Sequence, residues 1–223
     1  MSNYFFEVLR SGINTTFQDK GRFHMQHFGV TPGGCMDQDS FSIANALVGN
    51  HLDEGVLEFA YQGPLLKLKF GKVSFAIAGN VKFNVIRKNS SIEQGVCYKT
   101  FNLYQDDQID IISTHKSVYG YLSIQKGFKG DYFWGSCSTN TKSEIGSNNG
   151  KKFSVNERIY LNQAENDFCS NKINYINSKI EFIRVIKGTN FDYFFEIRHG
   201  SLAHPATDLL FPCLIWKRTS CAR

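Results

Sequence analysis

The stretch GINTTFQDKGRFHMQHFGVTPGGCMDQDSFSIANALVGN, residues 12–50, carries the strongest local signals in this sequence. Its second half predicts a helix over Gln38–Val48, because Asp37 is placed to accept hydrogen bonds from free amides of the first turn. Four apolar residues then fall on one helical face, namely Phe41, Ala44, Leu47 and Val48. Gly49 and Asn50 end the helix, since both tolerate the left-handed conformation of a C-terminal cap.

The first half of the same stretch places turn-forming residues beside polar side chains. Glycines recur at short intervals, and a single proline, Pro32, precedes two of them. The polar side chains that can bind a ligand here are Gln18, Asp19, Arg22, Asp37, Asn45 and Asn50. Binding and catalytic residues are often carried on loops that a rigid scaffold positions, so residues 12–50 are the first candidate site.

Outward from this stretch, most of the chain has the pattern of strands and turns. Phe, Tyr, Ile and Val are abundant, whereas Pro occurs four times. Seven segments have a strand pattern, namely residues 4–9, 65–70, 73–78, 82–87, 109–112, 119–125 and 179–186. Residues 142–152 and 162–178 are polar and are typical of loops. The sequence therefore predicts a mainly β barrel or sandwich with a few short helices.

Composition narrows the classes of function. The formal net charge is +5, and 42 % of the 223 residues are hydrophobic, which is ordinary for a globular protein. Basic residues form no long cluster, which argues against nucleic-acid binding. Neither a signal peptide nor an apolar run long enough to cross a bilayer is evident, so we expect a cytoplasmic protein without a membrane partner. The six scattered cysteines form no Cys-x-x-Cys pair, so we expect free thiols.

Five ordered blocks resemble the carboxyltransferase A/B family, which includes the C subunit of 5-oxoprolinase, the second subunit of allophanate hydrolase and part of urea carboxylase. The family pattern Thr-x-Gln-Asp-x-Gly-Arg matches Thr16–Arg22, and Gly-Val-Pro-x-Ser-Gly-x-Met-Asp resembles Gly29–Asp37. The pattern Ala-Asn-x-Leu-Val-Gly-Asn matches Ala44–Asn50. The patterns Leu-Glu…Gly-Pro and Gly-Ser-x-Ser-Thr resemble Leu57–Pro64 and Gly135–Thr139. Several blocks in the right order make a more specific signal than one short motif.

The resemblance implies a cyclophilin-like β-barrel at residues 1–165, a linker at 166–178 and the start of a second, similar subdomain at 179–223. We expect this second subdomain to be incomplete, because the resemblance fades after Phe194. From Asn190 onward the composition also shifts: no further asparagine follows, and Lys217 is the last lysine. Family members commonly extend well beyond 223 residues.

The resemblance also implies a subunit of an ATP-dependent 5-oxoprolinase that opens 5-oxoproline to glutamate. The implied cofactor is ATP, and the implied partners are a sister cyclophilin-like B subunit and a lactam-utilisation A subunit. Three alternatives stay open. One is a component of a biotin-dependent carboxyltransferase of the urea carboxylase or allophanate hydrolase kind. Another is a non-catalytic regulatory module that binds a partner protein. The third is a non-functional fragment, which the change in composition after Phe194 suggests.

Arg22 and Glu58 are the candidate catalytic residues. The Arg22 guanidinium can bind a carboxylate or phosphate through two parallel hydrogen bonds, with Asp19 orienting it, or the two residues can brace a loop. Glu58 lies between Leu57 and Phe59, where a carboxyl group can have a raised pKa and serve as acid or base. Its alternative is an ordinary outward-facing strand position.

The candidate substrate-binding residues are Gln18, Asp19, Asp37, Asn45, Ser136, Ser138 and Thr139. Gln18 can bind a lactam or ureido group, or it can stabilise a turn. Asp37 can hold a substrate nitrogen or act as a base, although helix capping is the simpler explanation of this residue. Ser136, Ser138 and Thr139 can donate to an acyl phosphate, a role that rests on the resemblance, or they can form a hydrophilic turn.

Metal and nucleotide motifs are missing from the sequence. His24 and His27 lie near Cys35, but a metal site needs three or four ligands and a further partner is not evident, so we expect none. The chain also lacks the Gly-x-x-x-x-Gly-Lys-Ser/Thr phosphate loop. Any ATP must therefore bind in an unconventional site or on a partner protein.

Overall fold

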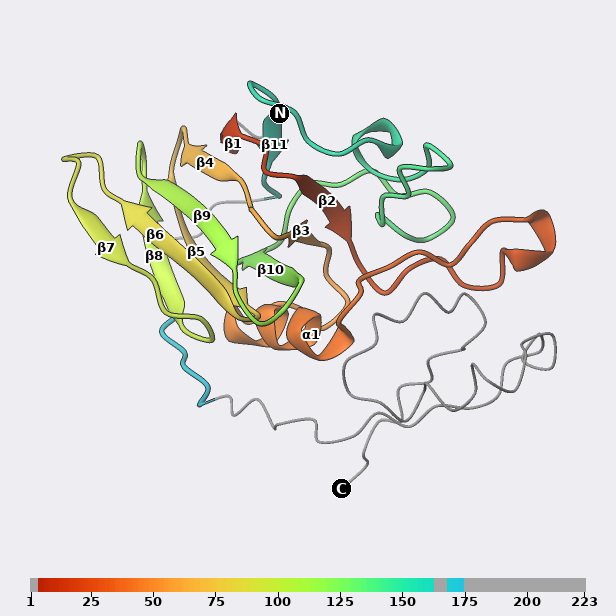
Figure 1. The fold of residues 1–223 in the computed structure, drawn as a ribbon, viewed down its shortest axis with the longest axis horizontal. Helices are drawn as coiled ribbons and strands as arrows, with labels where there is room; N and C mark the ends of the chain where they lie inside the picture. The colour runs from red at the N-terminus through yellow and green to blue at the C-terminus, as the bar shows by residue number, and fades with distance from the viewer. Residues whose placement is uncertain (1–3, 163–167, 175–223) are drawn as a thin grey trace, which may run out of the picture. The chain divides into compact units, whose positions relative to one another are not determined.

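Two antiparallel sheets form the described part of the chain, residues 4–162 and 168–174 of a computed structural model (Figure 1). The first sheet has six strands in the order β11-β1-β4-β9-β6-β7. Their bounds are β1 Phe5–Arg10, β4 Leu65–Leu68, β6 Val81–Ile86, β7 Ile92–Gln94, β9 Gln108–Thr114 and β11 Arg158–Tyr160. The second sheet has the order β2-β3-β10-β5-β8. Its bounds are β2 Asn14–Gln18, β3 Val56–Ala60, β5 Lys72–Ala78, β8 Thr100–Tyr104 and β10 Tyr119–Ile124.

One hydrophobic core joins the two sheets. The six-stranded sheet contributes alternate residues such as Phe6 and Val8 of β1, while the other sheet contributes Phe75 and Ile77 of β5. Because successive strand side chains point to opposite faces, every second residue enters this core. The predicted mainly β, cyclophilin-like fold is confirmed. The strand orders run as two open ladders in the described residues and do not close into one barrel.

The helix α1, Gln38–Leu47, packs on the other face of the five-stranded sheet (Figure 1). Its buried Phe41 and Ala44 contact Ala78 of β5 and Tyr121 of β10 in a second apolar cluster. The helix therefore covers a face that would otherwise be exposed. This covering explains why β5 is buried on both faces, and why its sequence, apart from Ser74, is an apolar run instead of an alternating one.

Most of the predicted elements match the structure. Asp37 is the N-cap of α1, as predicted, and the helix ends at Leu47 with Val48 as its C-cap. Six of the seven predicted strands overlap observed ones, and the segment 179–186 lies outside the described residues. Five observed strands had no clear sequence signal, namely β2, β3, β7, β8 and β11. The boundaries 1–165, 166–178 and 179–223 stay predictions, because residues 175–223 are not described.

Two short 3-10 helices complete the described elements. The first, η1, spans Gln26–Phe28 within the long loop that connects β2 to α1. Figure 1 shows this loop extending away from the sheets. The second, η2, spans Asn148–Gly150 in the predicted loop 142–152. Within the described ranges, none of the helices combines the length and the apolar composition that a membrane span requires.

Candidate functional site

The candidate site is organised around the backbone of the loop that leads into α1. Four consecutive amides of this loop each donate a hydrogen bond to the five-stranded sheet, to Asp19 just after β2, or to the segment 136–139. The donors and acceptors are Gly34 N to Ser138 Oγ at 2.8 Å, Cys35 N to Asp19 O at 2.9 Å, Met36 N to Glu58 Oε2 at 2.8 Å and Asp37 N to Tyr121 Oη at 2.7 Å. The buried polar residues predicted as a site thus fix the position of this loop.

Asp19 lies at the centre of the first part of the site. Its Oδ1 accepts hydrogen bonds from Gly21 N and Ser136 Oγ, both at 2.7 Å, and its Oδ2 accepts one from Cys137 N at 2.7 Å. The Asp19 residue is only 5 % exposed. Three donors compensate the cost of burying its charge. Asp19 therefore ties the end of β2 to the segment Ser136–Cys137.

Gln18 and Ser138 form the next part of the same network. Ser138 Oγ donates to Gln18 Oε1, and Gln18 Nε2 donates to the carbonyl oxygen of Thr139 at 3.0 Å. Thr139 in turn donates from its own amide to Phe17 O at 2.9 Å. All of these polar side chains are buried. Since their hydrogen bonds run to one another, the geometry shows a bracing role; whether they also bind substrate stays a prediction.

Arg22 is the largest fully buried side chain of the described residues, at 1 % exposure. Its Nη2 donates to Ser138 O and its Nε to Phe133 O at 3.4 Å. An ion pair with Asp19 is not formed in the described part of the chain, so two carbonyl oxygens orient the guanidinium. Burial lowers the pKa of Arg22 from its ordinary value, and the nearby Asp19 charge partly offsets this.

Nη1 of Arg22, unlike Nε and Nη2, makes no hydrogen bond to the described residues. It is buried and has no hydrogen-bond partner in the described residues. Gly33 covers it: a Cβ atom at Gly33 would lie 3.5 Å from Nη1 and 3.2 Å from Ser138 Oγ. Leaving a buried donor unpaired costs about 1–3 kcal/mol, so such a group calls for an explanation. Gly33 itself is exposed, so Nη1 lies directly below the protein surface.

Glu58 occupies the second part of the site, on β3. Strand alternation places it on the face opposite Leu57 and Phe59, as expected, yet it is 5 % exposed because the loop Cys35–Asp37 covers it. Its Oε2 accepts hydrogen bonds from Met36 N and from Tyr121 Oη, each at 2.8 Å.

The pKa values of Glu58 and of its neighbours Cys35 and Tyr121 are all raised. Burial raises the pKa of Glu58, and its two hydrogen bonds reduce that effect. Burial, with the Glu58 charge second, raises the pKa of Cys35 to about 12. The pKa of Tyr121 is raised for the same two reasons. Glu58 is therefore a carboxyl group that holds a proton more readily than usual, which is one property of an acid–base residue.

The remaining two predicted residues bind the helix to its surroundings. Asp37 caps α1, and its Oδ2 accepts a hydrogen bond from Ser40 Oγ at 2.9 Å. Asn45 is fully buried, and its amide donates to Glu54 O at 2.8 Å while its carbonyl accepts from Ser123 Oγ at 2.7 Å. Asn45 thus lies in a separate polar cluster. The loop 34–37 links Asp37 and Glu58 to the Arg22 network, whereas Asn45 shares none of the hydrogen bonds given above for that network.

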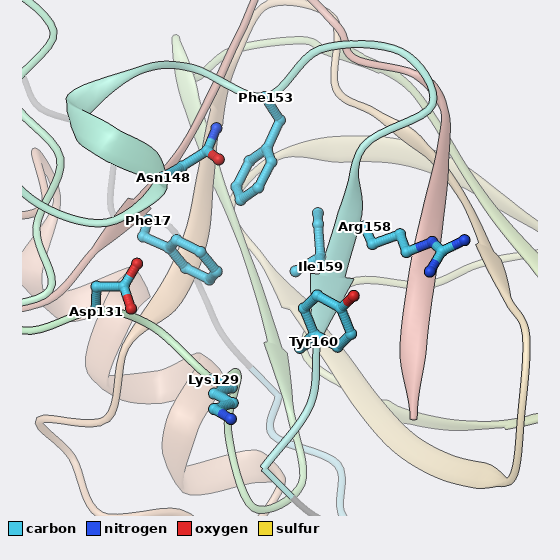
Figure 2. Close-up of a pocket in the computed structure, with 8 residues that line it drawn as sticks. All are labelled: Phe17, Lys129, Asp131, Asn148, Phe153, Arg158, Ile159 and Tyr160. Atoms are coloured by element: carbon cyan, nitrogen blue, oxygen red, sulfur yellow. The ribbon is translucent and has the colours of Figure 1, made fainter. Parts of the chain in front are cut away.

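A cavity of about 440 Å³ lies close to this network and was not predicted from the sequence. The residues that line it are Phe17, Lys129, Asp131, Asn148, Phe153, Arg158, Ile159 and Tyr160 (Figure 2). They come from β2, from the loop 129–131, from η2, from the loop that follows η2 and from β11, so a local pattern could not have grouped them. Phe17 precedes Gln18 on β2, which places the cavity and the polar network on neighbouring residues of one strand.

Metal ligands are not grouped within residues 4–162 and 168–174. Among these residues, no three His, Cys, Asp or Glu side chains are arranged to hold a metal ion. The four cysteines at 35, 97, 137 and 169 are free thiols. The chemistry available at the site is therefore that of a buried guanidinium, a buried carboxyl group and a set of fixed hydrogen-bond donors.

Comparison with known proteins places the chain in a family. The profile of the carboxyltransferase domain, subdomain A and B, matches residues 28–204. The chain belongs to this carboxyltransferase family.

Two kinds of relative share its sequence. The chain is 32 % identical over 161 residues to the urea amidolyase of Lachancea kluyveri, covering 72 % of this chain and 8 % of that protein. It is 24 % identical to the C subunits of the 5-oxoprolinases of Haemophilus influenzae and Escherichia coli, covering 72 % of this chain in each case. The chain spans half the length of these two relatives.

Solved structures show the same fold. The crystal structure of TTHA0988 superposes with a TM-score of 0.70 at 24 % identity, covering 83 % of this chain and 67 % of that one. The Kluyveromyces lactis urea carboxylase superposes with a TM-score of 0.67 at 31 % identity, covering 75 % of this chain and 14 % of that one.

Proposed function

We propose that this chain is a subunit of an ATP-dependent 5-oxoprolinase, which opens 5-oxoproline to glutamate together with partner subunits. Similarity to the C subunits of two bacterial 5-oxoprolinases supports this proposal. The chain covers half of their length, and we assign the whole reaction to the assembly of this chain with its partners. The partners in this proposal are a sister cyclophilin-like B subunit and a lactam-utilisation A subunit, and ATP binds with their help.

The observation that carries the proposal is the unpartnered Nη1 of Arg22 below Gly33. A buried guanidinium held by Ser138 O and Phe133 O keeps a fixed orientation. Nη1 is then preorganised to stabilise negative charge that develops on a substrate bound over Gly33. Direct contact requires the Gly33 backbone to move, which its lack of a side chain favours.

Opening a lactam needs a fixed positive group such as the Arg22 guanidinium. The lactam of 5-oxoproline is an unstrained amide and hence a poor electrophile. Phosphoryl transfer from ATP to the amide oxygen releases ADP and makes the ring carbon a good electrophile for water. The C–N bond of the resulting adduct then breaks and leaves the free amine and an acyl phosphate, which a second water hydrolyses to glutamate and phosphate. Negative charge builds on the oxygens during these steps, where a fixed donor is worth about 10²- to 10³-fold in rate. Glu58, with its raised pKa, is the candidate to exchange the proton.

The test is ATP-dependent release of glutamate from 5-oxoproline. The chain is assayed alone and with the candidate partner subunits from the same genome. We expect turnover in the mixture and not with the chain alone. Arg22→Lys, which keeps the charge but loses the planar fork, should lower kcat about 10²-fold or more.

A matched control separates this effect from damage to the fold. Arg10→Lys changes a half-buried arginine that binds Asp110 Oδ1 at 2.7 Å and Ile111 O at 2.9 Å, outside the candidate site. It should leave kcat unchanged. Equal losses in both variants, or full activity of Arg22→Lys with a cooperative unfolding transition, would count against the role of Arg22.

A second candidate function is carboxyl transfer from carboxybiotin to urea. The higher identity to a urea amidolyase, 32 % against 24 %, is the specific observation in its favour. Adding a carboxylated biotin carrier and urea to the same assay, and measuring loss of carboxybiotin, tests it. A stable complex with either partner set but without turnover of either substrate would instead support a regulatory binding module.

A further inference from the structure

The hydrogen bonds around Glu58 give its two carboxyl oxygens different surroundings. We infer that Tyr121 is a positioning residue: its hydroxyl and the Met36 amide occupy Oε2 of Glu58, so that Oε1 is the oxygen that takes up and releases a proton. This role of Tyr121 rests on the proposed function, because Glu58 is there the group that exchanges a proton with the substrate.

Strand pairing places a hydroxyl group on each side of Glu58. Glu58 of β3 lies opposite Tyr121 of β10 and opposite Thr16 of β2 in the register of the five-stranded sheet. Directly opposite residues of antiparallel strands point to the same face, with Cβ atoms about 4.5–5.5 Å apart. The loop Cys35–Asp37 covers this face, so Glu58 is 5 % exposed and Tyr121 is 0 % exposed. The carboxyl group and the Tyr121 phenol therefore meet in a place from which most water is excluded.

The single proton of the Tyr121 hydroxyl has one partner available to it. Asp37 N donates to Tyr121 Oη at 2.7 Å, so the phenol oxygen is the acceptor in that bond. A tyrosine hydroxyl carries one proton, which is left for Glu58 Oε2 at 2.8 Å. Burial and the nearby Glu58 charge raise the pKa of Tyr121, which keeps the phenol protonated. Tyr121 is thus a fixed donor to Glu58.

Oε2 of Glu58 faces two donors and cannot hold a proton without displacing one of them. Met36 N donates to it at 2.8 Å, in addition to Tyr121 Oη. A proton on Oε2 would leave a buried donor without its acceptor, which is costly. Oε1 makes no hydrogen bond to the described residues, and it is not buried, since Arg22 Nη1 is the one buried unpaired side-chain nitrogen or oxygen among them. The neutral acid therefore carries its proton on Oε1, where solvent has access.

The other titratable groups that face Glu58, besides Tyr121, come from the covering loop. They are Cys35 and Asp37, whereas Thr16 on the β2 side does not titrate. Burial raises the pKa of Glu58, its two hydrogen bonds lower it, and the Asp37 charge raises it. Because burial favours the neutral acid and the two donors favour the carboxylate, both forms are accessible, as acid–base catalysis requires.

In the proposed lactam opening, Glu58 acts as the acid. The C–N bond of the water adduct breaks, its electron pair goes to the ring nitrogen, and the proton of Glu58 Oε1 forms the new N–H bond. The hydroxyl of the adduct loses its proton to water as its oxygen becomes the carbonyl of the acyl phosphate. Solvent then returns a proton to Oε1 of the carboxylate. Tyr121 transfers no proton and stays bonded to Oε2 throughout.

Carboxyl NMR of the chain alone tests the hydrogen bond from Tyr121 without any assay of turnover. Carbon-13 is introduced at the side-chain carboxyl carbon of glutamate, and the Glu58 signal is identified by its loss in Glu58→Gln. Tyr121→Phe removes a donor to the carboxylate, so the pKa of Glu58 should rise. Tyr119→Phe is the matched control, because it deletes a hydroxyl from the same face of β10 that makes no hydrogen bond to the described residues. It should leave the pKa of Glu58 unchanged.

Hydrogen exchange of the wild-type chain reports which oxygen takes the proton, and it needs no variant to fold. The rate at the Met36 amide is divided by the rate at the Gly34 amide of the same loop, whose acceptor, Ser138 Oγ, does not titrate. This ratio should stay constant as pH passes through the pKa of Glu58. Protonation of Oε2 would instead release the Met36 amide and raise the ratio about tenfold, the effect of one lost hydrogen bond.

The pH dependence of kcat/KM, measured with the partner subunits, separates this role from a merely structural one. Activity that needs the neutral acid falls as pH rises through the pKa of Glu58, so Tyr121→Phe should move this fall to higher pH by the shift that NMR measures. Absence of turnover in the wild-type assembly would speak against the proposed function, and the two NMR measurements would still decide the role of Tyr121.

Three results would overturn that role. They are an unchanged pKa of Glu58 in Tyr121→Phe, an equal change in Tyr119→Phe, and faster relative exchange of the Met36 amide when Glu58 is protonated. An active Tyr121→Phe assembly whose pH profile stays in place, although its Glu58 pKa has moved, would show that Glu58 is not the group that exchanges the proton.

Discussion

Ser136 Oγ donates a hydrogen bond of 2.7 Å to Asp19 Oδ1 and thereby joins two residues 117 positions apart in the chain. The same carboxylate accepts hydrogen bonds from two backbone amides, those of Gly21 and Cys137. One buried charge thus connects the end of β2 to the segment that forms the far wall of the candidate site. Loss of either Asp19 or Ser136 should therefore destabilise the site.

Asp19→Ala should destabilise the protein by about 3 kcal/mol or more, since it leaves several buried donors unpaired at about 1–3 kcal/mol each. Ser136→Ala should cost about 1–2 kcal/mol, because it removes one donor to Asp19 and the acceptor of Ser138 N. Urea unfolding measures both. Ser143→Ala, an exposed position, is the control and should stay within about 0.5 kcal/mol of wild type. A small effect at Asp19 would show that the network is dispensable.

Glu58 should make stability depend on pH. Because burial raises its pKa in the folded state, the folded protein binds more protons than the unfolded chain above the ordinary value of 4.5. Stability contributed by this group is present below pH 4.5 and is lost as pH rises through the folded-state pKa. Glu58→Gln keeps an acceptor for Met36 N and Tyr121 Oη but does not ionise.

Relative to wild type, Glu58→Gln should therefore gain stability as pH rises above 4.5 and through the folded-state pKa of Glu58. Glu58→Ala should be less stable at every pH, by about 2 kcal/mol or more, since two donors lose their acceptor. Thermal or urea unfolding across this pH range measures both variants. A constant difference between Glu58→Gln and wild type would mean that the pKa of Glu58 is not raised.

A side chain introduced at Gly33 should reach Nη1 of Arg22, which has no hydrogen-bond partner among the described residues. Its φ of +65° strains any L residue by about 1–2 kcal/mol, so Gly33→Ala should be destabilising. Gly33→Ser has the same strain, but its hydroxyl can accept a hydrogen bond from Nη1, which a Cβ would approach to 3.5 Å. We expect the serine variant to be about 1 kcal/mol more stable than the alanine variant.

Gly29→Ala provides the control for strain alone, because Gly29 has a φ of +76° and nothing within 4 Å of its added Cβ. Urea unfolding of Gly33→Ala, Gly33→Ser and Gly29→Ala measures whether the serine hydroxyl stabilises the protein through Nη1. Equal stability of Gly33→Ser and Gly33→Ala would show that Nη1 is not within reach of a group at this position.

Cys35 should react slowly with thiol reagents although it is only partly buried. With a pKa of about 12, its thiolate fraction at pH 8 is on the order of 10⁻⁴. Removing the neighbouring charge by Glu58→Gln lowers this pKa and should speed alkylation by iodoacetamide several-fold. Mass spectrometry of the Cys35 peptide measures the rate, with the Cys97 peptide as the internal reference. An unchanged ratio of the two rates would contradict the coupling of Glu58 to Cys35.

Local patterns predicted the elements whose signals lie within one short segment. The cap at Asp37 and the apolar face of α1 are separated by a few residues, so the helix could be located to within one residue. Strand β4 alternates between core and surface, which also needs no distant partner. By contrast, β2 carries Thr15 and Thr16, which are buried although they are polar. Its pairing with β3 decides that it is a strand, and this pairing is not visible locally.

The candidate site divides in the same way. The sequence, with its family resemblance, singled out Arg22, Asp19 and Ser138 as polar residues near turns, and the structure brings these three into one network. It could not predict that Arg22 would be buried with one nitrogen that has no partner among the described residues, because the cover is a glycine eleven positions further on. Glu58 was a candidate acid or base, with an outward-facing strand position as the alternative, and the loop above it decides that it is buried.

The sequence by itself determined the mainly β class, the helix after Asp37 and the family, because these depend on short-range periodicity and on ordered motifs. The tertiary structure alone decided which polar residues are buried, which of them are paired, and that Phe17, Asn148 and Tyr160 line one cavity. The physical reason is that burial and hydrogen-bond pairing depend on segments that are remote in the chain and meet only when the two sheets pack together.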